Sequence, residues 1–473
     1  MGMIRPHVVD RHVKLGRSCG IQHQVARFPR HYVVPKTQYT CRSSTLEEAR
    51  TDSVVIVGAG VAGLNCAVHL TRQRIPVTVI ESSDGVGGRV RTDVVDGFLL
   101  DRGFQIFLTS YPEARRALDY DALDLRPFYA GALVRYQGAF HVVADPFRHL
   151  FDGLGSLMNP IGSPIDKLLV GVYRTATLLT SVEDTLKAPE TTIMECLKEQ
   201  GFSDSIIDRF FRPFLGGIFF DRNLQTTSRL FNFVMRMLAT GQNCLPSAGI
   251  GAVSDQLAGR LSADSIMLNT SVTSIDTSCN DHVTVSLDNG SSITAGAVVV
   301  ATDAPQAQRI LGAKLDAAPS TTKDPVGTCC LYFAADRAPR TGNYLYLDGD
   351  NKGGIVNNCC VPSEVSPSYA PAGKSLISVS VIGTKDDLTD AELERRVRSE
   401  LEDWFGKDTV ESWDHLKTYR IPFAQPNQTP PTDLFKPLQL ENRVYIAGDH
   451  RMTATLDGAL WSGRRVAEMI AQK

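Results

Sequence analysis

Apolar runs of strand length alternate with helical stretches along this chain. Residues 53–81 (SVVIVGAGVAGLNCAVHLTRQRIPVTVIE) have the pattern of a strand, a glycine turn, a helix and a second strand. The runs 295–305 (AGAVVVATDAP) and 444–449 (VYIAGD) are also apolar at their centres. The stretch 389–406 predicts an amphipathic helix, with apolar residues at helical spacing: Leu393, Val397, Leu401 and Trp404. This alternation predicts the α/β fold class.

The first turn carries Gly58, Gly60 and Gly63, and the second strand ends at Glu81. In such a turn the first glycine allows the tight bend, the second lets the backbone approach a pyrophosphate, and the third lets the helix pack on the sheet. The helix N-terminus offers free N–H groups to the phosphates, and a carboxylate at Glu81 accepts hydrogen bonds from ribose hydroxyls. The pattern predicts a dinucleotide site; the alternative is a glycine-rich turn without a ligand.

A second glycine turn follows directly, with Gly85, Gly87, Gly88 and then Arg89. It brings further N–H groups and a guanidinium to the same diphosphate. This GxGGR pattern resembles the flavin-containing amine oxidase superfamily, which includes amine oxidases, protoporphyrinogen oxidase and phytoene desaturases. The resemblance runs from about residue 53 to the C-terminus and implies that the dinucleotide is FAD.

The C-terminal motif strengthens the resemblance. Gly448 and Asp449 end an apolar strand, and a carboxylate there is suited to the ribityl hydroxyls. In the family, the helix that follows points its N-terminus at the isoalloxazine, where it favours the negative charge of reduced flavin. The resemblance places four residues against the ring: Leu456, Asp457, Gly458 and Ala459. It adds Gly103 and Val272 as further cofactor contacts.

The resemblance also implies a domain plan, in which a discontinuous, Rossmann-like FAD-binding domain alternates with a mixed α+β substrate domain. The FAD-binding parts are expected at 52–124, 246–318 and 440–473. The substrate parts are expected at 125–245, which reads as mainly helical from residue 146, and at 319–439.

The first fifty residues differ in charge from the rest of the chain. They hold nine Lys and Arg but three Asp and Glu, which leaves 40 against 49 for the remainder. A basic, acid-poor leader of this kind predicts an organelle transit peptide over 1–51, with the chloroplast favoured and the mitochondrion as alternative; a disordered tail is the other interpretation. The acidic body argues against nucleic acid as a partner.

Ten cysteines are present without any CxxC spacing, so neither a metal site nor a disulfide framework is expected. The pairs Cys329–Cys330 and Cys359–Cys360 lie in strand-like runs and are interpreted as small apolar core residues.

Two features that the family's amine oxidases usually carry are missing. The run 325–336 (PVGTCCLYFAAD) has no lysine inside the strand, although Lys323 precedes it, and MTATLDGAL has no aromatic residue beside the flavin. The run 210–220 holds five phenylalanines that either fill the core or line an apolar path to the flavin. These features favour an apolar, isoprenoid, carotenoid or tetrapyrrole-like substrate. It is expected to come from a membrane or a lipid carrier, with peripheral membrane contact of the protein, and to enter through the helical insert (146–245).

Three other functions stay open: an amine oxidase that releases hydrogen peroxide, a flavin-dependent isomerase without net redox chemistry, and a non-catalytic flavoprotein. Two residues are weak candidates for catalysis. His450 is a proton donor or acceptor with a pKa in the useful range, or a histidine without a catalytic role. Arg102 neutralises reduced flavin, or pairs with Asp101.

Overall fold

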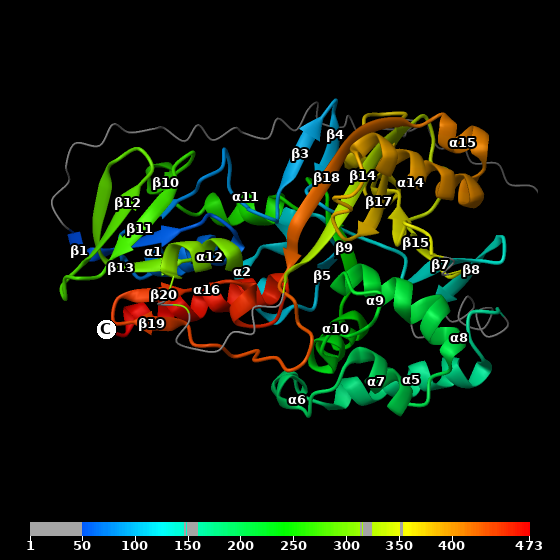
Figure 1. Cartoon of the computed structure of the whole chain (residues 1–473), viewed down its shortest axis with the longest axis horizontal. Coiled ribbons are helices and arrows are strands. Elements are labelled where there is room, and N and C mark those ends of the chain that lie inside the picture. The colour runs from blue at the N-terminus through cyan, green and yellow to red at the C-terminus, as the bar shows by residue number, and fades with distance from the viewer. Residues whose placement is uncertain (1–49, 146–147, 149–158, 313–314, 316–323, 351–352) are drawn as a thin grey trace, which may run out of the picture. The chain divides into compact units, whose positions relative to one another are not determined.

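Figure 1 shows a computed structural model, which describes residues 50–145, 148, 159–312, 315, 324–350 and 353–473. The transit peptide predicted over 1–51 lies outside the described residues, apart from the start of the first strand.

The first sheet has eight strands, which come from three separate stretches of the chain. The path β10-β2-β1-β13-β12-β11 is extended by β20 beside β13 and by β19 beside β20. The bounds are β1 Arg50–Val57, β2 Val77–Ile80, β10 Ile266–Met267, β11 Val272–Asp276, β12 Val283–Leu287, β13 Ser292–Val300, β19 Gln439–Glu441 and β20 Val444–Ile446. The strands β10, β2, β1, β13 and β20 pair in parallel. Their central residues are buried Val, Ile and Ala, the pattern of strands covered on both faces.

Helices α1 (Val61–Arg72) and α16 (Leu456–Ala471) pack against each other beside this sheet (Figure 1). The side-chain amide of Asn65 donates a hydrogen bond to the Leu460 carbonyl at 2.7 Å. A Cβ at Gly463 would lie 2.1 Å from the Ala62 carbonyl oxygen, so the helices approach as closely as a glycine allows. The two segments predicted at opposite ends of the chain therefore form one layer.

The second sheet has seven strands in the order β18-β14-β17-β16-β15-β7-β8. The bounds are β7 Gly131–Tyr136, β8 Ala139–Ala144, β14 Val326–Ala335, β15 Leu345–Asp348, β16 Asn358–Cys360, β17 Ser375–Ile382 and β18 Asp414–Gln425. Two small sheets accompany it: β3 (Thr92–Val95) with β4 (Phe98–Asp101), and β5 (Phe107–Leu108) with β9 (Asn243–Pro246) and β6 (Leu125–Pro127).

The helical insert follows β8 and comprises α5 Pro164–Leu179, α6 Val182–Lys187, α7 Ile193–Glu199, α8 Asp204–Ile206, a π-helical turn Ile207–Phe211, α9 Arg212–Phe219 and α10 Ser228–Thr240. The other α-helices in the described residues are α2 Pro112–Ala117, α3 Tyr120–Leu123, α11 Ala252–Ala258, α12 Ala304–Leu311, α13 Pro362–Val365, α14 Asp390–Phe405 and α15 Lys407–Glu411. The predicted amphipathic helix is confirmed as α14, whose Leu393, Val397 and Leu401 are buried.

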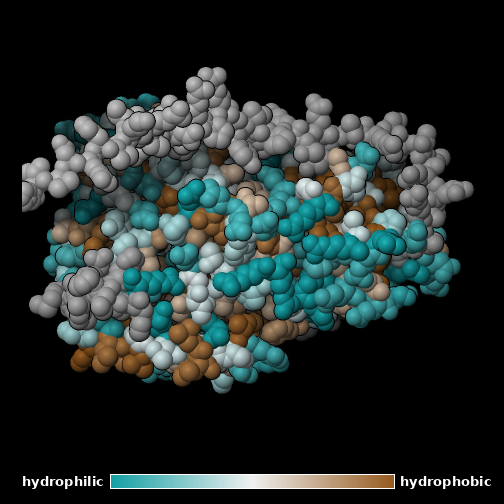
Figure 2. Space-filling model, turned by 180° about the vertical axis from the view of Figure 1, so that it is seen from behind, coloured by the Kyte–Doolittle hydropathy of each residue, from teal (hydrophilic) through white to brown (hydrophobic). Residues whose placement is uncertain are grey.

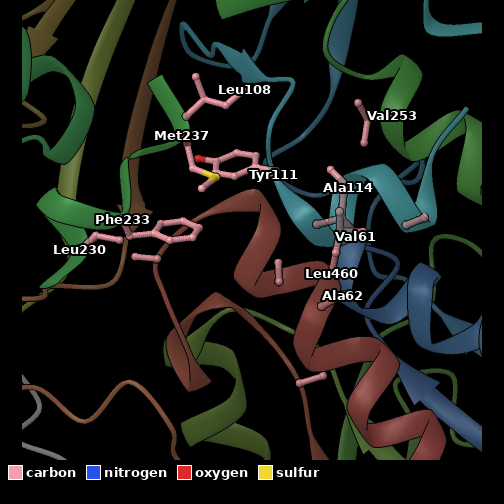
Figure 3. Close-up of a cluster of buried hydrophobic side chains, with 14 of the residues drawn as sticks. Val61, Ala62, Leu108, Tyr111, Ala114, Leu230, Phe233, Met237, Val253 and Leu460 are labelled. Atoms are coloured by element: carbon pink, nitrogen blue, oxygen red, sulfur yellow. The ribbon is translucent and has the colours of Figure 1, made fainter. Parts of the chain in front are cut away.

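The insert shares a hydrophobic core with the first sheet's helices. Figure 3 shows side chains of α1, α2, α10, α11 and α16 converging in this cluster. Tyr111 and Phe233 stack there with ring centroids 6.0 Å apart. Aromatic pairs of this geometry add about 0.5–1.5 kcal/mol beyond the area that they bury. The insert therefore packs against the helices of the first sheet through a shared apolar core.

The cysteine pairs lie in β14 and β16, where all four thiols are buried and free. Burial raises the pKa of Cys329 and Cys330 to about 11, so both thiols stay protonated near neutral pH. Among the described residues, no cluster of His, Cys, Asp or Glu has the arrangement of a metal site.

Candidate cofactor site

A cavity opens at the carboxyl ends of the parallel strands of the first sheet. It encloses about 1390 Å³ of empty space, including its open mouth. Val57, Ile80, Ala301 and Gly448 mark the points where β1, β2, β13 and β20 end on its wall. The crevice outside the carboxyl ends of parallel strands is where open α/β sheets bind ligands.

The three glycines of the first turn have three distinct surroundings. Gly58 has a φ of +105°, and a Cβ there would lie 2.8 Å from the Ala301 carbonyl oxygen. A Cβ at Gly63 would lie 2.1 Å from the Gly58 carbonyl oxygen, where the helix packs on the sheet. Gly60 lines the cavity, and a Cβ there would have no protein atom within 4 Å. A side chain at Gly60 would therefore project into the cavity.

Helix α1 begins at this cavity with a bare N-terminus. Its N-cap residue is Gly60, no side chain caps the first turn, and Val61 and Ala62 lie on the cavity wall. Glu81 lies beside it, and its carboxylate accepts hydrogen bonds from the Ala59 and Ser83 backbone N–H groups, both at 2.9 Å. This loop holds Glu81 in place at the cavity.

The second glycine turn lies against the first. Gly87 donates its N–H to the Ala59 carbonyl at 2.8 Å, and Gly87, Gly88 and Arg89 line the cavity. The Arg89 guanidinium is directed to Asp449 by two hydrogen bonds, of 2.7 and 2.8 Å. Burial opposes the charge on Arg89, and the Asp449 carboxylate nonetheless raises its pKa. This ion pair joins the N-terminal and C-terminal motifs at the cavity.

Four residues at the start of α16 were expected against the flavin ring, and only two of them lie on the cavity wall. Leu456 and Ala459 line the cavity, whereas Asp457 and Gly458 do not. The buried Asp457 carboxylate accepts hydrogen bonds from the Glu113 and Ala114 N–H groups at the start of α2, and burial raises its pKa to about 6. A Cβ at Gly458 would lie 2.2 Å from the Thr453 carbonyl oxygen. Neighbouring helical residues face different directions, so the motif serves both the cavity and the core.

The two remaining predicted cofactor contacts, Val272 and Gly103, also have different positions relative to the cavity. Val272, at the start of β11, lines the cavity. Gly103 does not line the cavity. It has a φ of +88°, and a Cβ at this position would lie 2.6 Å from the Ile421 side chain.

Of the two interpretations of His450, its surroundings favour the histidine without a catalytic role. His450 is 7% exposed, and neither ring nitrogen has a hydrogen-bond partner among the described residues. Burial lowers its pKa to about 3, so the imidazole is neutral throughout the physiological range. It is also absent from the residues that line the cavity.

The expected pairing of Arg102 with Asp101 is wrong. Arg102 forms an ion pair with Asp93 at 3.0 Å, across the β3–β4 hairpin. Asp101 is buried and accepts hydrogen bonds from Thr92, Tyr369 and the Ile250 N–H group, and burial raises its pKa to about 6. Arg102 follows the last residue of β4, and its side chain reaches Asp93 rather than Asp101.

Several cavity residues were not predicted from the sequence. Thr302, Asp303, Gln306 and Arg309 line the cavity from the start of α12. The end of the apolar run 295–305 is the signal that marks them, because polar residues after a buried strand lie at the ligand edge of the sheet. Ala424 and Gln425 come from the second sheet and carried no local signal.

These residues fit FAD. An open cradle at Gly60, a helix N-terminus without a side-chain cap and a fixed carboxylate at Glu81 are the groups that a dinucleotide requires. Of the fifteen predicted cofactor residues, those on the cavity wall are Gly58, Gly60, Glu81, Gly87, Gly88, Arg89, Val272, Gly448, Asp449, Leu456 and Ala459.

Comparison with known proteins identifies the family. Residues 61–471 match the model of the flavin-containing amine oxidoreductases. The chain therefore belongs to this family of FAD-dependent oxidoreductases, and its cofactor is FAD.

The similar proteins differ in substrate. Hydroxyneurosporene desaturase of Rubrivivax gelatinosus is 41% identical over 121 residues, which cover 24% of this chain and 22% of that protein. Coproporphyrinogen III oxidase of Bacillus subtilis is 23% identical over 285 residues, which cover 52% and 59%. The chain thus matches less than two thirds of the length of either relative.

A solved structure shares the fold. A putrescine oxidase variant superposes with a TM-score of 0.67 at 16% identity and covers 89% of this chain and 99% of its own. At this identity the likeness concerns the fold alone.

Proposed function

We propose that the chain oxidises a bulky, largely apolar substrate of the isoprenoid, carotenoid or tetrapyrrole type. The substrate gives up a hydride equivalent and a proton, and bound FAD supplies the two-electron acceptor. An external acceptor must then take the two electrons. The chain's own residues bind the substrate, orient it and exclude water.

The observation that carries the proposal is an aromatic pair on the helical insert. Phe210 and Phe214 stack with ring centroids 5.3 Å apart. Both rings are partly buried and pack against two hydrophobic clusters: the one beside the first sheet and the one on a face of the second sheet. Neither phenylalanine lines the cofactor cavity. We propose that the apolar surface they form borders the substrate path, because such surfaces suit apolar ligands.

The residues of the second sheet also support an apolar substrate over a polar amine. Its strand β14 contains no lysine, and the Thr328 hydroxyl donates a hydrogen bond to the Val381 carbonyl at 2.9 Å. The residues just before α16 are Thr453, Ala454 and Thr455, so no aromatic ring stands there. The missing lysine and the missing aromatic ring support an apolar substrate over a polar amine in this proposal.

Replacing Phe214 with Asp tests the proposal, because a charge in an apolar wall carries a large desolvation cost. We expect the variant to keep FAD and to lose substrate-driven bleaching of the flavin. Phe435→Asp is the matched control, since Phe435 is exposed and is not part of either cluster. Bleaching that survives in Phe214→Asp would reject the apolar wall as the substrate path.

The amine oxidase is the second candidate, because a putrescine oxidase shares the fold. Release of hydrogen peroxide on addition of putrescine or an aryl amine would favour it.

We further propose that the helical insert contacts a lipid surface from which the substrate is taken. In α5, the large apolar residues Ile165, Leu168, Val172 and Leu179 are 58–84% exposed. Their spacing puts them on one face, and none of the exposed residues of α5 is charged. Figure 2 shows hydrophobic side chains gathered at the lower left, over the insert. A helix with such a face lies in the plane of a membrane surface.

No helix in the described part of the chain combines the length and the hydropathy needed to cross a bilayer. The contact that we propose is therefore peripheral.

Delivery to the chloroplast by residues 1–51 stays a proposal that rests on the charge of the leader. A chain that begins at residue 52 should bind FAD as the full chain does, and residues 1–51 fused to a fluorescent protein should direct it to plastids. Diffuse fluorescence would contradict the targeting role.

A further inference from the structure

A second cavity adjoins the cofactor cavity. It encloses about 450 Å³, including its mouth, and lies between α9, α10 and the segment that follows β18. Gln425 lines both cavities. Its side-chain amide donates a hydrogen bond to the Ile218 carbonyl at 2.9 Å, which ties the end of β18 to α9. Gln425 therefore stands at the boundary between the two spaces.

The walls of this second cavity combine apolar and polar residues; the polar ones are Asp221, Thr226, Gln425, Asn427, Gln428 and Thr429. Phe219 and Phe220 contribute from the end of α9, Leu230 from α10 and Val326 from the start of β14. Phe220 has a φ of +53°, a left-handed conformation that bulky residues rarely adopt. The turn is fixed by Asp221, whose carboxylate accepts hydrogen bonds from the Gln225 and Thr226 N–H groups at 2.6 and 2.8 Å. The chain thus maintains a strained aromatic residue at the cavity, as occurs at functional sites.

One polar group of this wall lacks a partner. Gln428 is 9% exposed, and its Nε2 donates a hydrogen bond to the Met452 carbonyl at 3.3 Å. Its Oε1 accepts no hydrogen bond in the described structure. A buried amide oxygen without a donor is unfavourable, and a ligand that supplies a donor removes that cost.

We infer that this second cavity receives part of the substrate and that Gln428 is a specificity-determining residue, whose side-chain oxygen accepts a hydrogen bond from an O–H or N–H group on an otherwise apolar molecule. The inference rests on the proposed function and narrows its substrate class. A hydroxylated isoprenoid and a porphyrinogen share this chemistry, because both join a large apolar skeleton to a donor. A pure hydrocarbon lacks it.

Binding, rather than turnover, gives the direct test. The FAD-loaded full chain is titrated with geranylgeraniol, with its methyl ether and with coproporphyrinogen III under anaerobic conditions, and binding is followed by calorimetry. The alcohol and its ether differ in one donor. We expect the wild type to bind the alcohol about tenfold more tightly than the ether, as expected for one hydrogen bond, and the porphyrinogen arm shows whether N–H donors are also accepted.

Gln428→Met removes the acceptor at similar volume and should abolish the preference for the alcohol. Gln439→Met is the matched control, since Gln439 also donates to a backbone carbonyl, at 3.0 Å, but does not line the cavity. FAD content and melting temperature show whether each variant is folded. If Gln428→Met does not fold, Val326→Trp, which fills the cavity from its wall, should weaken binding of the alcohol at least tenfold.

Equal binding of alcohol and ether by the wild type, or a preference that persists in Gln428→Met, would overturn the inference. The proposed function fails separately, if the ligands bind with the expected preference but no apolar substrate reduces the flavin.

Discussion

Arg89 and Asp449 form a two-pronged ion pair, with Nη2 to Oδ1 at 2.7 Å and Nη1 to Oδ2 at 2.8 Å. The two residues are 360 positions apart in the chain, and both line the cofactor cavity. Arg89 also donates to the Ala424 carbonyl at 2.9 Å and lies over the Phe423 ring. This one guanidinium therefore connects both FAD motifs with the end of β18.

Removing either partner should weaken the fold and the cofactor site together. Asp449→Asn keeps the size of the side chain but removes the charge that compensates Arg89. We expect the free energy of unfolding to fall by about 1.5–3 kcal/mol, the contribution of a hydrogen bond to a charged group, and FAD retention to fall with it. Denaturant unfolding and FAD content measure the two effects. Lys187→Met, in the exposed Lys187–Glu183 pair, is the control and should change neither.

Gly60→Val should remove FAD without unfolding the protein. The backbone at Gly60 has a φ of −71°, which valine tolerates, and the new side chain would occupy the cavity. We expect FAD affinity to fall at least tenfold, or about 1.4 kcal/mol. Gly171→Val is the matched control, because a Cβ at Gly171 also meets no protein atom within 4 Å but lies on α5. A Gly60→Val protein that purified with one FAD per chain would reject the phosphate-loop assignment.

His450→Leu should make the protein less sensitive to acid. The folded-state pKa of His450, about 3, lies below its unfolded value near 6.5, so the unfolded chain binds the proton first. As the pH falls from 6.5 towards 3, the wild type should therefore lose stability relative to the variant, by about 1.4 kcal/mol per pH unit. Parallel stability curves for the two proteins over pH 6 to 4 would show that His450 does not titrate in this way.

The lipid contact can be tested on α5. Leu168→Glu and Leu179→Glu each place a charge on the exposed apolar face and should lower co-sedimentation with liposomes about tenfold or more, since burying a leucine contributes about 1.5–3 kcal/mol. Val94→Glu is the control, because Val94 is similarly exposed but lies on β3. Equal loss of binding in all three variants, or no loss in any, would reject α5 as the contact.

Local patterns predicted the parts of this site that lie within one element. The strand, turn and helix at 53–81 could be predicted because Gly58, Gly60 and Gly63 meet requirements that the adjacent backbone imposes. The same holds for α14, where burial follows the 3.6-residue period at Leu393 and Val397.

Contacts between distant segments could not be predicted in this way. Asp457 lies within the flavin motif by sequence, yet its carboxylate caps the start of α2. It accepts a hydrogen bond there from the N–H group of Glu113, a residue 344 positions away in the chain. Arg102 follows Asp101 directly, yet its side chain forms an ion pair with Asp93. The hairpin register places Asp101 opposite Thr92 instead. His450 is neutral because it is buried, and the short polar sequence Asp449-His450-Arg451 does not indicate that burial.

The central claim is that bound FAD takes electrons from an apolar substrate. Anaerobic bleaching of the flavin tests it most directly, with the purified protein mixed separately with a carotenoid precursor in liposomes, with coproporphyrinogen III and with putrescine. We predict that one of the two bulky compounds, the carotenoid precursor or the porphyrinogen, bleaches the flavin, that Phe214→Asp abolishes this bleaching, and that putrescine has no effect. Rapid bleaching by putrescine, unchanged in Phe214→Asp and followed by hydrogen peroxide release in air, would contradict the account and establish an amine oxidase.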